Sequence, residues 1–307
     1  ACQQQTLSAQ DRKTPVIGLA WLDNNQEYFD SWCTSIEAAG GQAVILDKVM
    51  FSEDWYDESG NLQQKCIGES GMLSQECAND VKINNYYKSN VEEVVRGIDG
   101  IIFPGGDDIS TTLYKNPVPN ETSEPYEPTR DVSDYLLMSY CIDRKIPFLS
   151  ICRGMQMLGV VSGCTIVQDI PTYCEQNGIA NKYAHRMPIE LGSANMDYVP
   201  HEVEIVDGNE YLSKSTGGAS KTGLMPSWHH QTISGAEGTP LKINAYSISP
   251  NGYRAIEAVE YTGTRLALGI QFHPEKVVRS KTYSQAEQPP YDYEQCLAFL
   301  SSFVSMV

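Results

Sequence analysis

The sequence predicts an α/β fold in which a mostly parallel sheet is flanked by helices, with a β-rich second half. First, short apolar runs alternate with helical patterns through the first half of the chain, which is typical of strand-helix-strand units and a parallel sheet. Second, the glycine pairs Gly40-Gly41 and Gly105-Gly106 follow such segments and mark their ends. Third, from about Val199 onward the segments become short and β-rich.

The elements of the first half follow one another without a long linker. Pro15 to Trp21 is a short apolar run, as expected of a buried strand. The helical pattern from Asn25 to Ala39 stops at Gly40-Gly41, a pair suited to a helix C-terminus. The next predicted elements are strands at 44–46 and 100–103, a helix at 129–143, a strand at 146–151 and a short helix at 155–161.

The second half is read as β-rich with one closing helix. We find no internal repeat or low-complexity tract that would divide the chain. We therefore expect a polar N-terminal tether over residues 1–14 and a single domain over residues 15–307. The predicted elements of this half are strands at 201–206, 241–247, 253–260 and 266–272, and a helix at 293–304.

A polar, acidic segment between residues 51 and 90 interrupts the alternation. From Phe51 to Asp80 it carries seven acids against one lysine. We interpret it as an insertion at the rim of the sheet, where it can shape access to a site. Ten residues separate Cys66 from Cys77, a span that suits a disulfide if the protein is exported. Two free surface thiols are the alternative.

Composition excludes some classes of partner. The 307 residues carry a net charge of −17, which repels phosphate backbones and argues against nucleic-acid binding. No apolar run approaches the ~18 residues of a membrane span, so we expect no transmembrane segment. At 41% hydrophobic residues the chain can bury a core. A homo-oligomer is compatible with the sequence.

The N-terminus and the cysteine count bear on the compartment. The chain opens with Ala1-Cys2 before a polar stretch, which resembles the trimmed end of a bacterial lipoprotein signal with Cys2 as the lipidated residue. On that interpretation the protein is exported or anchored to the envelope; if the start is a tag remnant, it is cytoplasmic. Nine cysteines are an odd number, so at least one thiol is free, and a free thiol is a candidate nucleophile.

Cys152 is the strongest candidate for that nucleophile. It lies in Ser150-Ile151-Cys152-Arg153-Gly154, between an apolar strand and a helix, where a tight turn lifts the middle residue out of the sheet. A helix N-terminus favours thiolate, and the backbone N–H of Arg153 can stabilise an oxyanion. A buried cysteine that merely ends a strand is the alternative.

A histidine base and its orienting carboxylate are predicted at the end of the last strand. His273 and Glu275 flank Pro274. Residues i and i+2 of a strand face the same side, so we expect Glu275 to hold the imidazole of His273. Because Pro274 cannot donate to a ladder, this stretch should be a strand end, which is where such sheets place their ligands.

The glycine pair Gly105-Gly106 follows another predicted strand, 100–103. Glycines there let the backbone approach a ligand, so an N–H of Gly105 or Gly106 can complete an oxyanion hole with that of Arg153. A plain turn is the alternative. As a phosphate loop the segment fails, because it lacks the glycine spacing and carries Asp107 and Asp108.

At these residues the chain resembles the class I glutamine amidotransferase superfamily, and more closely its γ-glutamyl hydrolase branch. Two departures are a serine, Ser150, where the elbow usually begins with glycine, and the long acidic segment. The resemblance runs from about residue 15 to 275 and rests on Pro104-Gly105-Gly106-Asp107, Arg130-Asp131, Ile151-Cys152-Arg153-Gly154-Met155-Gln156, Gln168-Asp169-Ile170, His185, Trp228-His229-His230-Gln231, Ala255-Ile256-Glu257-Ala258 and Gln271-Phe272-His273-Pro274-Glu275.

The resemblance implies a flavodoxin-like sheet and a Cys-His-Glu triad of Cys152, His273 and Glu275, with no metal or organic cofactor. For substrate binding it implies one of the adjacent histidines, of which we choose His230 over His229. Gln156, within the elbow motif, and Arg130, which can recognise a carboxylate, complete the expected substrate-binding set. No spacing typical of a metal site is present, so His185 and His201 are expected to be structural or surface residues.

For the activity, the resemblance implies cleavage of the amide bond of a small γ-glutamyl substrate through a thioester intermediate. One alternative is a glutaminase subunit that delivers ammonia to a partner synthase. Another is a catalytically silent binding protein on the same scaffold. The residues leave the amine leaving group open.

Overall fold

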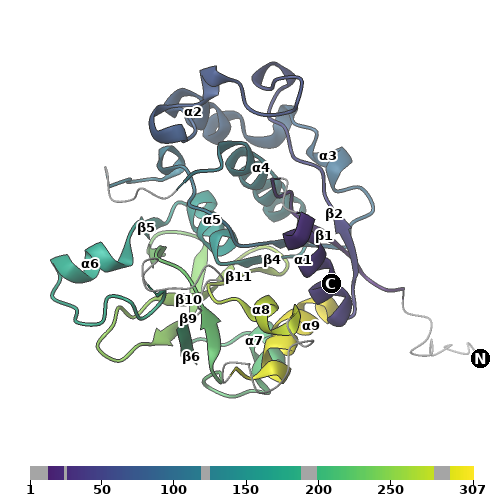
Figure 1. Cartoon of the computed structure of the whole chain (residues 1–307). Coiled ribbons are helices and arrows are strands. Elements are labelled where there is room, and N and C mark those ends of the chain that lie inside the picture. The colour runs from purple at the N-terminus through teal and green to yellow at the C-terminus, as the bar shows by residue number, and fades with distance from the viewer. Residues whose placement is uncertain (1–12, 24–25, 119–124, 188–198, 280–290) are drawn as a thin grey trace, which may run out of the picture.

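The computed structural model describes residues 13–23, 26–118, 125–187, 199–279 and 291–307. Cys2 and nearly all of the expected tether, residues 1–12, lie outside the described residues. Within the described residues, no helix has the length and apolar character that crossing a membrane requires. The chain forms a central sheet with helices on both faces (Figure 1).

The described part of the chain builds a nine-stranded sheet in the order β2-β1-β3-β4-β11-β10-β9-β6-β7. The neighbours from β2 to β11 pair in parallel, and those from β11 to β7 pair antiparallel. This confirms the predicted sheet and its β-rich second half. The strands are β1 (Val16–Leu19), β2 (Gln42–Ile45), β3 (Gly100–Phe103), β4 (Phe148–Ile151), β6 (Val199–Ile205), β7 (Met225–Ser227), β9 (Leu241–Ile248), β10 (Ile256–Tyr261) and β11 (Ala267–Ile270).

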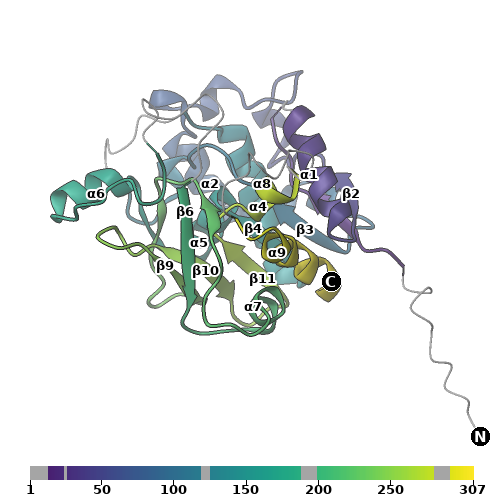
Figure 2. The same cartoon turned by 60° about the horizontal axis from the view of Figure 1, so that its bottom comes forward.

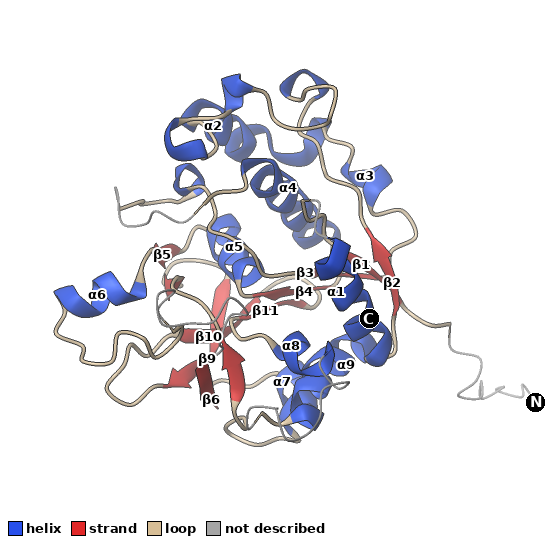
Figure 3. Ribbon diagram, in the orientation of Figure 1, coloured by secondary structure: helices blue, strands red, loops and turns tan. Residues whose placement is uncertain are grey.

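Helices cover the two faces of the sheet as separate layers (Figure 3). On β3, Ile101 and Phe103 face one layer while Ile102 faces the other, as the alternation of side chains along a strand requires. One layer holds α2 (Gln75–Asn84), α3 (Val91–Val94), α4 (Pro128–Arg144) and α5 (Arg153–Ser162); the other holds α1 (Gln26–Ala38), α7 (Glu210–Thr216), α8 (Pro274–Arg279) and α9 (Tyr293–Met306).

A smaller motif includes α6 (Ile170–Gln176), which projects from the side of the molecule that holds the antiparallel strands β6 and β9 (Figure 2). Strands β5 (Thr165–Val167) and β8 (Thr232–Gly235) pair antiparallel, and α6 follows β5. The N-terminus of α6 is capped by Asp169, whose side chain accepts from the Thr172 N–H, a favourable cap. Sequence patterns did not reveal β5, β7, β8, α6 or α7, because each is shorter than the windows in which periodicity can be recognised.

The acidic segment 51–90 packs over α4 and is not merely a rim of loops (Figure 1). Its apolar side chains, including Trp55 and Leu73, join the same buried cluster as the α4 residues. Tyr86 donates to Asp143 on α4 at 2.6 Å. Cys66 and Cys77 form a disulfide with a Cα–Cα distance of 5.6 Å, which is one of the two alternatives that the sequence left open. The segment therefore contributes to the core; whether it shapes access to the site stays a prediction.

Candidate active site

Cys152 occupies a strained turn between β4 and α5. Its backbone has φ 53° and ψ −106°, a region that non-glycine residues adopt only where the surroundings enforce it. The Cys152 N–H donates to Ile270 at 2.9 Å, and its carbonyl accepts from Gln156 at 3.0 Å. A Cβ on Gly154 would lie 2.5 Å from the Phe103 carbonyl oxygen, so the turn requires glycine there. The predicted elbow geometry is therefore confirmed, and Ser150 does not prevent it.

His273 and Glu275 lie together beside Cys152. His273 Nδ1 is 2.7 Å from Glu275 Oε1, and both side chains are buried. Burial alone would lower the pKa of His273, but the charge of Glu275 and a hydrogen bond with the Cys152 side chain raise it to about 10. Burial would likewise raise the pKa of Glu275, yet the charge of His273 holds it below its ordinary value. The structure thus brings the three predicted triad residues together, with a direct hydrogen bond between His273 and Glu275.

The local geometry that joins His273 to Glu275 differs from the predicted one. Strand β11 already ends at Ile270, and helix α8 begins at Pro274, so Glu275 is helical and not part of a strand. Proline suits the first turn of a helix, where its missing N–H is not needed. The turn into α8 brings the two side chains together by a different path, while the His273 N–H is anchored to the Pro226 carbonyl at 2.9 Å.

The loop of Gly105 and Gly106 comes close to the triad. A Cβ on Gly105 would lie 2.9 Å from His273 Cε1 and 3.6 Å from Cys152 Cβ. A Cβ on Gly106 would overlap the Arg130 guanidinium. The first N–H of α5, that of Arg153, directly follows Cys152 in the chain. The backbone of Gly105 therefore lies beside Cys152, and the role of these N–H groups as an oxyanion hole stays a prediction.

Arg130 and Arg153 form a buried charge network behind this loop. Arg130 Nη2 donates to the carbonyls of Pro104 and Gly105, each at 2.9 Å. Arg153 donates to Asp134 at 2.6 Å and pairs with Asp131. Burial raises the pKa of Asp131 to about 6, against the opposing effect of the Arg153 charge. The observed contacts of Arg130 position the glycine loop; its predicted contact with a substrate carboxylate remains untested.

His230 bridges two carboxylates. Its Nε2 is 2.8 Å from Asp108 Oδ1, and its Nδ1 is 3.0 Å from Asp169 Oδ1. Burial lowers the pKa of His230, but hydrogen bonds to the two carboxylates outweigh it and raise the pKa to about 9. The ring is therefore a cation at neutral pH. This position near the C-terminal end of β3, which Asp108 follows, is compatible with the predicted role of His230 in substrate binding.

The other two predicted substrate-binding residues are engaged inside the protein. His229 Nδ1 is 2.9 Å from the Gln231 carbonyl, and its Nε2 is 3.3 Å from Glu257 Oε1. Gln156 Nε2 donates to the Gln231 carbonyl at 3.0 Å. Both side chains are buried, so contact with a substrate stays a prediction for each.

Two neighbours of Cys152 were not found by sequence reasoning. Its Sγ lies 3.8 Å from the Trp228 carbonyl oxygen. Tyr28, on α1, is also close: a Cβ on Gly105 would lie 3.6 Å from its hydroxyl. Burial and then the charge of Glu275 raise the pKa of Tyr28, so it stays a neutral hydroxyl. A lone aromatic residue on an amphipathic helix carries no signal of such a position.

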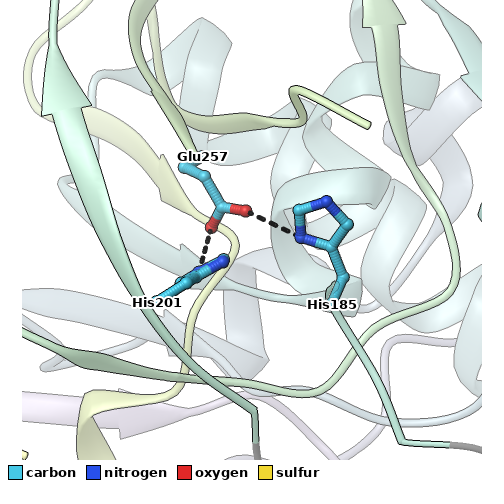
Figure 4. A group of neighbouring side chains, drawn as sticks. All are labelled: His185, His201 and Glu257. Atoms are coloured by element: carbon cyan, nitrogen blue, oxygen red, sulfur yellow. Dashed lines mark ion pairs between the residues drawn. The ribbon is translucent and has the colours of Figure 1, made fainter. Parts of the chain in front are cut away.

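One group of buried side chains outside the triad has the chemistry of metal ligands. His185, His201 and Glu257 each offer an atom, and these atoms lie within 4.8 Å of one another (Figure 4). Histidine nitrogen and carboxylate oxygen are ligands of zinc in proteins.

Comparisons with known proteins agree with this site. The Peptidase C26 family matches residues 72–275, a span that contains the elbow, the glycine loop, His273 and Glu275. A γ-glutamyl-γ-aminobutyrate hydrolase from Escherichia coli K12 is 31% identical over 189 residues, covering 61% of this chain and 68% of that protein. A glutamine amidotransferase-like protein from Rickettsia prowazekii is 28% identical over 219 residues, covering 62% and 75% respectively.

Among solved structures, a glutamine amidotransferase from Thermotoga maritima superposes with a TM-score of 0.48 at 14% identity, covering 95% of this chain and 96% of that one. The sequence match is the decisive finding, since it spans the greater part of the chain and all the elements that build the elbow. The chain therefore belongs to the Peptidase C26 family, within the glutamine amidotransferase-like hydrolases.

Proposed function

We propose that the protein hydrolyses γ-glutamyl amide bonds with Cys152 as nucleophile, His273 as general acid and base, and Glu275 as the residue that orients His273. The observation that carries this proposal is that all three side chains are buried together: His273 Nδ1 is 2.7 Å from Glu275 Oε1, and His273 and Cys152 both lie beside Gly105. A nucleophile, a base and an orienting carboxylate in that order are the components of a hydrolytic triad.

The chemistry follows from these positions. The Cys152 thiolate attacks the amide carbonyl and forms a C–S bond, giving a tetrahedral oxyanion. Collapse of the oxyanion breaks the C–N bond, and the His273 imidazolium gives its proton to the departing amine. Water then attacks the thioester, with neutral His273 accepting its proton. The products are free glutamate and the amine, and Cys152 is regenerated.

Burial and charge prepare His273 for the first half of this cycle. Its raised pKa, about 10, keeps the imidazolium populated at neutral pH, so a proton is available for the leaving amine. The backbone N–H groups of Gly105 or Gly106 and of Arg153 are proposed to receive the oxyanion.

The γ-glutamyl specificity is drawn from the Escherichia coli relative, which is a γ-glutamyl-γ-aminobutyrate hydrolase. A γ-glutamyl substrate carries an α-carboxylate and an α-ammonium group beside the scissile amide. The cationic His230 and the acidic Asp107, exposed in the loop after β3, are charges suited to these two groups.

The direct test is the turnover of a panel of γ-glutamyl amides by wild type and by Cys152→Ala. We expect the variant to lose about 10⁴-fold or more of the rate, since the nucleophile has no substitute. Cys33→Ala, which removes another free thiol, is the matched control and should keep wild-type turnover. Retention of activity by Cys152→Ala would refute the proposal. Including glutamine in the panel separates the hydrolase from an ammonia-delivering glutaminase, whose activity should depend on a partner synthase.

A further inference from the structure

Three side chains from separate segments converge inside the β-rich half of the molecule. Glu257 lies on β10, His201 on β6, and His185 in the chain after α6 (Figure 4). Their exposed fractions are 0%, 5% and 1%. A fourth side chain, His229, places its Nε2 3.3 Å from Glu257 Oε1. The catalytic steps proposed above use none of these four groups.

The polar atoms of this cluster face one another without forming hydrogen bonds. His185 Nδ1 is 3.8 Å from Glu257 Oε1, and His201 Nε2 is 3.5 Å from Glu257 Oε2. Within the described residues, no hydrogen-bond partner is found for either oxygen of Glu257, for Nδ1 of His185, for either nitrogen of His201, or for Nε2 of His229. Each buried polar atom left unsatisfied costs about 1–3 kcal/mol. So many in one place indicate a missing ligand.

The protonation pattern explains why the facing atoms do not bond. His185 Nε2 lies 2.6 Å from the Tyr253 carbonyl oxygen, which can only accept, so this nitrogen carries the proton. In the neutral ring, Nδ1 then presents a lone pair to the Glu257 carboxylate. His229 repeats the arrangement: its Nδ1 donates to the Gln231 carbonyl at 2.9 Å, so Nε2 presents a lone pair to Glu257. A bound cation would accept these lone pairs together with one from the carboxylate.

We propose that this cluster binds a structural zinc ion through His185 Nδ1, His201 Nε2 and a carboxylate oxygen of Glu257, with His229 Nε2 as the nearest fourth donor. Zinc binds nitrogen and oxygen ligand atoms at about 2.0–2.2 Å in tetrahedral geometry. Two ligand atoms of such a site are therefore about 3.4 Å apart. Glu257 Oε1 is 3.8 Å from His185 Nδ1 and 3.3 Å from His229 Nε2, and Glu257 Oε2 is 3.5 Å from His201 Nε2, all close to that separation. The backbone carbonyls of Tyr253 and Gln231 supply the outer hydrogen bonds that orient metal-bound histidines.

The burial of the cluster makes the ion structural and not hydrolytic. With ligands exposed by 5% or less, no open position faces solvent, whereas a catalytic zinc keeps one. The ion would fix the segment that lines the triad. The His185 carbonyl accepts from the His229 N–H at 3.1 Å and from Ser227 Oγ at 3.0 Å. Between those two residues lies Trp228, whose carbonyl is next to Cys152 Sγ.

Metal content of the purified full chain tests the proposal. The protein is produced with zinc available, isolated on a metal-free affinity resin without chelator, and analysed by inductively coupled plasma mass spectrometry. We expect about one zinc ion per chain. Glu257→Gln and His201→Ala should each lose at least about tenfold of that zinc content. His230→Asn, at a buried histidine between two carboxylates outside the cluster, is the matched control and should keep it.

Wild-type protein alone provides a second measurement that does not depend on the folding of variants. Dipicolinate should remove the ion and lower the Tm, and stoichiometric Co²⁺ should restore the Tm and produce the strong visible absorption of a tetrahedral site. Zinc-free wild type that takes up neither Zn²⁺ nor Co²⁺ would overturn the proposal and leave a buried histidine-glutamate ion-pair cluster. Full zinc content in Glu257→Gln and His201→Ala would overturn it equally.

Discussion

Gly105 shows how closely the backbone must approach the triad. A single methyl group at this position would lie 2.9 Å from His273 Cε1, so the imidazole would have to move. Gly105→Ala is expected to lower kcat at least about 100-fold, since a displacement of about 1 Å costs that much in a preorganised site. The Tm should change little. Gly235→Ala, where an added Cβ meets no atom within 4 Å, is the control, and equal kcat values for the two variants would contradict the assigned geometry.

The pair of His273 and Glu275 makes a prediction about pH. Because the pKa of His273 is raised to about 10, the folded protein keeps a proton that the unfolded chain loses near pH 6.5. The free energy of unfolding contributed by this pair is therefore complete below about pH 6.5 and is lost as the pH rises through about 10. In Glu275→Gln the pKa of His273 should fall towards its ordinary value. The free energy of unfolding of this variant should then no longer decrease over that pH range.

Urea denaturation of both proteins across that range measures the effect. The free energy of unfolding of wild type should exceed that of Glu275→Gln most near pH 6.5. This difference should shrink by up to about 1.4 kcal/mol per pH unit at higher pH. Glu37→Gln, on the exposed side of α1, controls for the general effect of removing a carboxylate. A difference between wild type and Glu275→Gln that is the same at every pH would show that Glu275 does not hold the proton on His273.

At the scale of elements, the acidic segment 51–90 is expected to depend on its disulfide. The Cys66–Cys77 bond closes a short loop between the 3-10 turns and α2, over buried contacts with α4. Cys66→Ser with Cys77→Ser should lower the free energy of unfolding by about 2–4 kcal/mol. Cys33→Ser, at a half-buried free thiol, should have a small effect by comparison. An unchanged urea midpoint in the double variant would mean that the segment is held by packing alone.

The elements that the sequence predicts best are those with long periodicity or strong turn signals. Helix α4 begins one residue before the predicted start and ends one residue after the predicted end. The turn at Cys152 lies between a strand and a helix, as the sequence around it predicts. The strand predicted through Phe272 instead stops at Ile270, and the turn into α8 was missed. Proline fits both a strand end and a first helical turn, so the residues alone do not decide between them.

At the scale of the molecule, the β-rich half brings together residues that no local pattern connects. His185, His201 and Glu257 become neighbours only because β6 and β10 flank β9 in one sheet. Metal motifs recognisable in a sequence have ligands at fixed short spacings, and this cluster has none. The same holds for Tyr28 and Trp228 around Cys152. The proposed triad residues could be predicted because each stands in its own local motif, whereas contacts that depend on the order of strands in the sheet required the structure.

The proposed hydrolysis predicts a covalent intermediate at one atom of the molecule. Wild-type protein is mixed with a γ-glutamyl amide, quenched in acid during turnover and examined by peptide mass spectrometry. We expect one γ-glutamyl group on the Cys152 peptide, absent in Cys152→Ala and accumulating when thioester hydrolysis is slow. Turnover of the same substrate with no modification of Cys152, together with undiminished turnover by Cys152→Ala, would contradict the central claim.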